Sequence, residues 1–173
     1  LSDKVGGDSS QRTLTSSLSL LVLTKAAVNN SVTLPLNLKV SGGATAITAM
    51  NQLPDGNLNL NSGALILDNI AWGTFAGARS NGTGNGQWQI TGGGFAARGT
   101  AVTIPNDTSG GLSASTFDRN FTLGSSARDG GGNLYANAGV TIARDTTLTA
   151  ARTITVAANG VGLGAGTPIL NKI

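Results

Sequence analysis

Two aspartates at matching positions are the residues of this chain that could do chemistry. Asp107 ends the stretch VTIPND, and Asp145 ends the stretch VTIARD. Two carboxylates are what glycoside hydrolysis requires. If 19 residues form one repeat, the aspartates stack two repeats apart with Ser126 between them, at about 9–10 Å, which is the wide end for an inverting pair. Aspartate after a strand also forms turns with its own backbone, and we favour that interpretation.

The remaining composition excludes most catalytic and metal-binding chemistry. The chain has no histidine and no cysteine, which removes Ser-His-Asp and Cys-His catalysis and the usual zinc sites. The glycine run 92–94 lacks the lysine and the helix of a phosphate-binding loop. The run 130–132, within DGGGN, lacks the repeated unit of a calcium roll. We expect both runs to form corners or loops, and we expect no catalytic residue, no metal and no cofactor.

Neither a nucleic acid nor a membrane is an expected partner. The net charge of +3 comes from 11 basic and 8 acidic residues, and the arginines from Arg79 to Arg152 are scattered. Nucleic-acid binding usually needs clustered basic residues interleaved with aromatic ones. The most apolar run, residues 17–24, is too short to span a bilayer and has no basic leader. We expect a strand or a short helix there.

The overall composition predicts an all-β fold. Glycine supplies 26 of 173 residues, whereas charged residues make up 11% and aromatic ones 4%. This departs from globular averages, but 39% hydrophobic residues argue against disorder. In NLNLNSGALILD, paired leucines flank a turn at 61–63. The first residue is Leu1 and the last stretch is PILNKI, so we expect a fragment of, or a product processed from, a longer extracellular protein.

The clearest strand signal is SVTLPLNLKV. Its alternating apolar residues are Val32, Leu34, Leu36, Leu38 and Val40. Strict alternation predicts a strand, and Pro35 places it at a sheet edge because proline cannot donate a ladder hydrogen bond. Such an edge could complete the sheet of a second copy by strand addition. These five residues are therefore candidates for self-association, with an ordinary edge strand as the alternative.

Apolar–polar–apolar triplets recur along the second half of the chain. They begin at Trp88, Val102, Phe121, Val140 and Ile154, at separations of 14, 19, 19 and 14 residues. This rhythm predicts a parallel β-helix or related β-solenoid, although an antiparallel β-sandwich also has evenly spaced strands. Residues 1–30 do not repeat in step and are assigned to an N-terminal cap or extension. Residues 31–173 are assigned to a single solenoid-like domain.

Two stretches carry a resemblance to a known family. GQWQITGGGFAARGTAVTI and FDRNFTLGSSARDGGGNLYANAGVTIARDTTLTAARTITV resemble passenger domains of bacterial autotransporters with autotransporter-associated β-strand repeats. The resemblance covers roughly residues 87–166. It implies a right-handed β-helix on the outer surface of a Gram-negative bacterium, working in adhesion, aggregation or matrix formation. The N-terminal third departs from the pattern because it does not repeat in step.

Three aromatic residues bear on a sugar-binding function. Trp72, Trp88 and Tyr135 could stack on sugars if they were exposed together. Trp88 alternates with an isoleucine in QWQI, which is typical of a core position. Trp72 and Tyr135 are therefore the candidate glycan contacts, with core packing as the alternative for Trp72.

These observations lead to three functional hypotheses. The first is a non-enzymatic extracellular structural or adhesive module, whose Thr-, Asn- and Ser-rich β surface contacts glycans or copies of itself. The second is a self-assembling fibre subunit that uses the strand 32–40 for strand addition. The third is a polysaccharide-acting β-helix enzyme that uses its aspartates.

Overall fold

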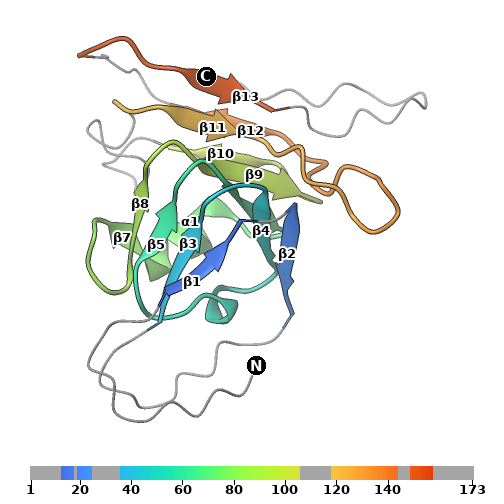
Figure 1. Ribbon diagram of the computed structural model, residues 1–173, viewed down its shortest axis with the longest axis horizontal. Coiled ribbons are helices and arrows are strands. Elements are labelled where there is room, and N and C mark those ends of the chain that lie inside the picture. The colour runs from blue at the N-terminus through green and yellow to red at the C-terminus, as the bar shows by residue number, and fades with distance from the viewer. Residues whose placement is uncertain (1–12, 18, 25–35, 106–117, 144–148, 158–173) are drawn as a thin grey trace.

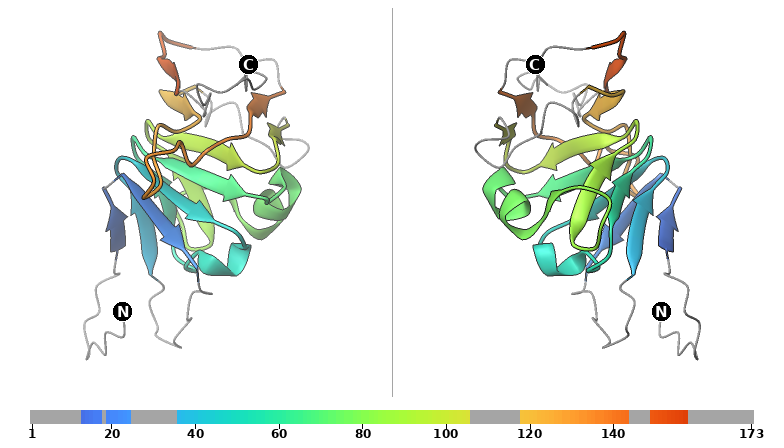
Figure 2. Two further views of the ribbon diagram at one scale, coloured as in Figure 1. Left: turned by 90° about the vertical axis from the view of Figure 1, so that its right-hand side faces the viewer. Right: turned by 90° about the vertical axis from the view of Figure 1, so that its left-hand side faces the viewer.

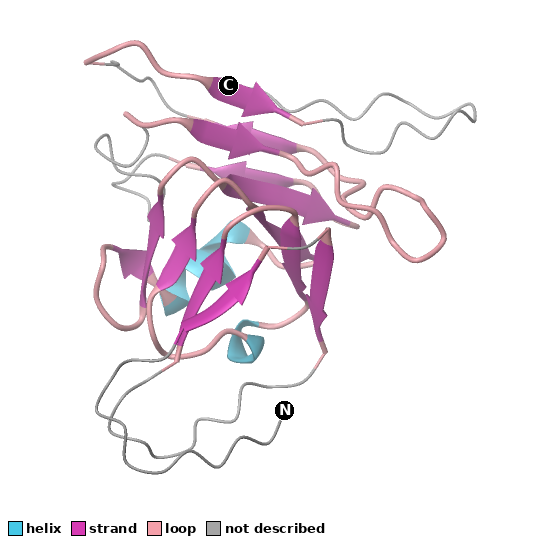
Figure 3. Ribbon diagram, viewed as in Figure 1, coloured by secondary structure: helices cyan, strands magenta, loops and turns pink. Residues whose placement is uncertain are grey.

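The structure is a computed structural model that describes residues 13–17, 19–24, 36–105, 118–143 and 149–157 (Figure 1). Strands dominate these residues, and the helices among them are the 3-10 helix η1 (Met50–Gln52) and the α-helix α1 (Trp72–Ala78) (Figure 3). The all-β prediction is confirmed. Within the described ranges, no helix is long and apolar enough to cross a membrane.

The described strands form three sheets. The five-stranded sheet has the order β1 (Thr13–Ser16), β3 (Asn37–Val40), β5 (Leu58–Leu60), β8 (Gln87–Ile90), β7 (Ser80–Asn81). The six-stranded sheet has the order β13 (Ile154–Val156), β11 (Phe121–Leu123), β9 (Gly94–Arg98), β6 (Ala64–Asp68), β4 (Ala44–Ile47), β2 (Leu20–Leu23). The two-stranded sheet pairs β10 (Val102–Ile104) with β12 (Val140–Ile142).

All strand pairings within these sheets are parallel, as for β3 with β5 and β4 with β6. The antiparallel sandwich considered from the sequence is therefore wrong. The chain enters the two large sheets in turn, with β3 followed by β4, β5 by β6, and β8 by β9. We call one circuit of the chain through both large sheets a pass. The strands of each pass lie beside those of the previous pass (Figure 2).

The 19-residue spacing is not the structural repeat. The two VTI triplets, β10 and β12, pair with each other, and their Val102 and Val140 are 38 residues apart. The triplet between them, β11, lies in the six-stranded sheet beside β9 and β13. Paired residues elsewhere have other separations, for example 20 residues for Leu38 and Leu58 and 30 for Leu58 and Trp88. The number of residues per pass differs because only the paired strands must align, whereas the connections between them, such as the one that contains α1, vary in length.

The described part of the N-terminal segment extends the same two large sheets. β1 pairs with β3, and β2 pairs with β4. The apolar run at 17–24 thus contains a strand, which is one of the two alternatives expected there, a strand or a short helix. β1 and β2 are the terminal described strands of these two sheets, and the expected boundary at residue 30 lies outside the described residues.

The core lies between the two large sheets and a third wall made by η1, α1 and β10 with β12 (Figure 2). Alternate residues of each strand point inward, so that Leu38, Leu58 and Trp88 align in one buried row. Trp72 and Phe75 of α1 fill the same core, with ring centroids 5.0 Å and 5.3 Å from Phe95. The prediction that Trp88 is a core residue is confirmed by its exposure of 1%.

Glycines form the corners between the two large sheets. The predicted turn at 61–63 is confirmed, and Ser62 has a φ of 66°. The predicted corner is confirmed at Gly92 and Gly93, which link β8 to β9, while Gly94 is the first residue of β9. A Cβ at Gly93 would overlap the carbonyl oxygen of Gly63, and one at Gly94 would overlap that of Thr122. Successive passes approach each other here too closely for any side chain.

Residues 124–138 lie across the outer face of the six-stranded sheet. That face is made mainly of alanines, Ala44, Ala46, Ala64 and Ala96, together with Ile66. Ala127 and Ala136 pack on them as a second apolar cluster. The backbone nitrogen of Tyr135 donates to the carbonyl of Ala127 at 2.9 Å. The six-stranded sheet is therefore covered on both faces over part of its area.

The corner packing makes Gly94→Ala a test of the fold. The added methyl group has no space, so we expect a loss of about 1–3 kcal/mol, which lowers the melting temperature by roughly 2–12 °C for a chain of this size. Gly130→Ala is the control, because nothing lies within 4 Å of a Cβ there. Thermal unfolding followed by circular dichroism measures both variants. Equal melting temperatures would contradict the close approach at Gly94.

Candidate binding surface

The outer face of the five-stranded sheet carries a row of polar side chains in register. Thr15, Lys39, Asn59 and Gln89 occupy paired positions on β1, β3, β5 and β8. They alternate with buried residues along each strand, so they point away from the core. Thr15 is exposed and the other three are half-buried. Four successive strands therefore present one continuous polar stripe.

The chemistry of this stripe is hydrogen bonding with little charge. It offers one hydroxyl, one ammonium and two amides at a spacing of about 4.8 Å per strand. The Asn59 amide oxygen accepts a hydrogen bond from the Thr91 hydroxyl at 2.8 Å, which orients it on the surface. The groups repeat from strand to strand at the surface, so the stripe suits recognition by many shallow contacts.

A buried polar corner supports one end of the five-stranded sheet. The Arg79 guanidinium follows α1 and donates to the carbonyl of Gly56 at 2.9 Å and to that of Pro54. Burial lowers the pKa of Arg79, and the charge of Asp55 opposes this effect. The Asn57 amide donates to the carbonyls of Gly82 and Gly84 at 3.2 Å and 3.3 Å. The corner ties α1 and the loop before β8 to the segment that leads into β5.

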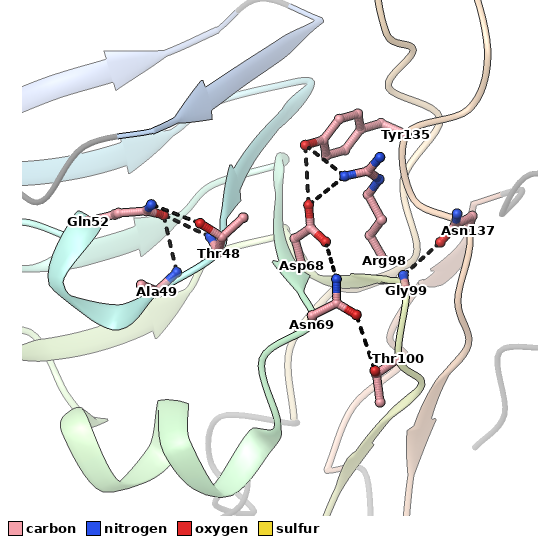
Figure 4. A network of polar contacts seen from close by, with 10 residues as sticks. All are labelled: Thr48, Ala49, Gln52, Asp68, Asn69, Arg98, Gly99, Thr100, Tyr135 and Asn137. Carbon is pink, nitrogen blue, oxygen red and sulfur yellow. Dashed lines mark hydrogen bonds and ion pairs between the residues drawn. The ribbon is translucent and has the colours of Figure 1, made fainter.

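A second polar cluster joins residues 124–138 to the six-stranded sheet (Figure 4). The Arg98 Nη1 atom lies 2.7 Å from Oδ2 of Asp68, and the Tyr135 hydroxyl lies 3.4 Å from the same oxygen. The guanidinium carbon of Arg98 is 4.4 Å from the ring centroid of Tyr135, a cation–π geometry. The hydrogen bond with Asp68 raises the pKa of Arg98, and burial raises the pKa of Tyr135. These satisfied contacts hold the covering segment in place.

The aspartate of DGGGN forms a turn. One carboxylate oxygen of Asp129 accepts hydrogen bonds from the backbone nitrogens of Gly131 and Asn133, each at 2.9 Å. These bonds lower the pKa of Asp129, with the one from Asn133 contributing most. Across the described ranges, no three His, Cys, Asp or Glu residues lie close enough together to hold a metal ion.

The structure corrects part of the predicted self-association strand. β3 is paired on both sides, with β1 and β5, so it is not an edge strand. Leu38 and Val40 are fully buried in the core of their own chain, and they are not available to a second copy. Leu36 is 39% exposed. Val32, Leu34 and Pro35 lie outside the described residues.

The two candidate glycan contacts do not form a common platform. Trp72 is only 4% exposed, because α1 packs it against Phe95 and Trp88. Its suggested role as a glycan contact is therefore wrong in this arrangement. Tyr135 is half-buried, and its ring is engaged by Arg98.

The predicted aspartate pair lies outside the described residues. Asp107 and Asp145 follow strands β10 and β12, which are direct neighbours. The expectation that another repeat with Ser126 lies between them is wrong, because β11 belongs to the six-stranded sheet. Sequence reasoning missed the pairing of Asp68 with Arg98. Its signal is an Asp and an Arg at the same register position of neighbouring strands, which becomes visible only once the register is known.

No family model, no curated protein and no solved structure matches this chain.

The last described pass is tied to the preceding one by Asp118. Its carboxylate accepts a hydrogen bond from Nε of Arg152 at 2.8 Å, and others from the hydroxyl and the backbone nitrogen of Thr149. These bonds, led by the one from Arg152, lower the pKa of Asp118 from 3.8 to about 2. The backbone nitrogen of Thr153 donates to the amide oxygen of Asn120 at 3.0 Å.

These contacts predict an acid-sensitive contribution to stability. Because the folded pKa of Asp118 is about 2 and the ordinary value is 3.8, its contribution is complete above about pH 4 and is lost as the pH falls through about 2. Asp118→Asn should therefore melt at a lower temperature than the parent at neutral pH. The difference should shrink between pH 4 and pH 2 in melting curves recorded across that range. A difference that stays constant down to pH 2 would contradict the role of Asp118.

Proposed function

We propose that this chain is a parallel β-helix that acts as a non-enzymatic structural or adhesive module. The architecture is supported by the regular return of the chain to the same two parallel sheets, one pass after another. It is also supported by the corners, where glycines let successive passes approach closely. A right-handed coil agrees with the general preference of parallel crossover connections.

The polar stripe is the observation that carries the proposed function. Thr15, Lys39, Asn59 and Gln89 repeat hydrogen-bonding groups at the strand spacing on one face. A repeated surface of this kind gains affinity from several weak contacts made together, which suits an extended partner. Surface glycans and other copies of this chain are extended partners of this kind.

An extracellular site of action on a bacterial outer surface belongs to the same proposal. It is supported by the resemblance of residues 87–166 to autotransporter passenger domains, and by a composition rich in Gly, Thr, Ser and Asn without cysteine. The roles that follow are adhesion, aggregation or matrix formation. The polar contacts around Asp68, Arg98 and Asp118 are mutually satisfied, which supports a structural role for them.

Beads coated with the protein test this function. We expect coated beads to aggregate with each other or to adhere to a mucin-coated surface. Asn59→Asp combined with Gln89→Glu keeps the side-chain shapes but adds two negative charges to the stripe, which should weaken adhesion roughly tenfold. The readouts are bead cluster size and the flow that detaches the beads.

Asn51→Asp is the matched control, since Asn51 is exposed on η1, outside the stripe. It should adhere as the parent does, and melting curves should show that all variants are folded. Beads that neither cluster nor adhere would contradict the proposed function. Equal loss of adhesion in the control and the stripe variant would contradict the assignment to the stripe.

A further inference from the structure

A groove of about 500 Å³ opens on the six-stranded sheet, on a different surface from the polar stripe. Its lining includes Gly43, Ser62 and Gly92 from the corners, and Ser125 and Ser126 from the segment after β11. Thr122 and Thr155 come from the outer face of β11 and β13, where they are register neighbours. Short side chains leave the space open, and hydroxyl groups surround it.

The groove crosses the strands instead of following one of them. Its lining residues lie in or directly beside β4, β6, β9, β11 and β13, which are consecutive in the sheet. Four steps between these strands amount to roughly 19 Å at the usual spacing. The groove therefore has the length for an extended molecule that lies along the stacking direction.

The lining is neutral and rich in hydrogen-bonding groups. Among the residues that the structure describes, six hydroxyl side chains and the Asn120 amide line it, and no charged side chain does. The hydroxyl side chains are Ser62, Thr122, Ser125, Ser126, Thr153 and Thr155. A hydroxyl donates one hydrogen bond and accepts two. Thr122 donates to the carbonyl of Gly92 at 3.1 Å and keeps capacity to accept, while Thr153 and Thr155 are exposed.

The same observations disfavour other ligand classes. A peptide that binds by strand addition needs a free sheet edge, but the groove lies on the face of the sheet. Its inner strands are already paired there, for example through Gly94 N to Gly63 O at 3.0 Å and Thr122 N to Gly93 O at 3.1 Å. An anionic polymer would lose hydration without meeting a cation. An apolar ligand would leave the hydroxyl groups of the lining without partners.

We propose that this groove is a binding site for a neutral, linear oligosaccharide. Hydroxyl and amide groups match the hydroxyl groups of an uncharged sugar chain, and the length of the groove suits several sugar units in a row. This inference deepens the proposed adhesive function and rests on it for the biological context. Its residues are separate from Asn59 and Gln89, so the two can fail independently.

Titration calorimetry of the full chain with defined sugars tests the site. The probes are cellohexaose, maltohexaose, mannohexaose and the fully N-acetylated hexamer of glucosamine as neutral ligands, and hexagalacturonate as the charged comparison. At least one neutral hexasaccharide should bind, more tightly than its disaccharide, and hexagalacturonate should bind more weakly. Thr155→Val combined with Ser126→Ala removes two hydroxyl groups and should weaken binding roughly tenfold.

Thr103→Val is the matched control. Thr103 is an exposed mid-strand threonine on β10, as Thr155 is on β13, and its replacement should leave sugar binding unchanged. The Asn59→Asp, Gln89→Glu variant should also bind the sugar as the parent does, even if bead adhesion is lost.

Four calorimetric results would overturn the proposal, and a fifth result comes from sedimentation. They are no binding of any neutral hexasaccharide, tighter binding of hexagalacturonate, equal binding by the parent and the Thr155→Val, Ser126→Ala variant, and equal losses in this variant and the Thr103→Val control. Dimers of the parent that the Thr155→Val, Ser126→Ala variant dissociates, seen by sedimentation, would instead identify the groove as a contact between copies and would also overturn it. None of these results bears on bead adhesion through the stripe, so failure of the groove and failure of the proposed function are distinguishable.

Discussion

The rest of the structure depends on parallel, in-register backbone pairing between successive passes of one chain. Strands as short as β5 and β11, three residues each, have little stability alone. Each of them forms backbone hydrogen bonds with the paired strand of the preceding pass. The pairing aligns side chains that point to the same side of the sheet, so that one inward row contains Leu38, Leu58 and Trp88. A single register therefore determines the core and the outer surfaces together.

That register also explains why the chain is rich in glycine and poor in charge. Passes that lie at the strand spacing must turn in little space, and the corner at Gly63, Gly93 and Gly94 has no room for a Cβ. A charge repeated in register would face a like charge in the next pass. Neutral threonine, asparagine and glutamine avoid that repulsion. Their polar groups still keep the stripe and the groove hydrated and able to form hydrogen bonds with a partner.

The sequence predicted local elements better than it predicted which strands pair with each other. All five triplets are strands, and the turn at 61–63 is where the leucine pattern placed it, because alternation and turn residues act within a few positions. The pairing of Val102 with Val140 could not be predicted from a 19-residue rhythm, since the length of each pass depends on insertions such as α1. The burial of Trp72 and the contact between Asp68 and Arg98 depend on that pairing, so the sequence alone did not predict them. The triplets did indicate that Gln89, Thr122 and Thr155 face outward, but which of these polar residues form one surface depends on the strand pairing, which the sequence does not give.

Disulfide cross-linking tests the in-register parallel stack most directly, and the chain has no native cysteine to interfere. Asn59 and Gln89 are register partners on β5 and β8, so their Cα atoms lie about 4.8 Å apart, within the reach of a disulfide. Asn59→Cys with Gln89→Cys should cross-link on mild oxidation, shown by faster migration in a non-reducing gel. Asn59→Cys with Gln87→Cys, two residues out of register on the same strands, should cross-link far less. Equal cross-linking of the two pairs, or preference for the second, would contradict the register on which the fold and both binding surfaces depend.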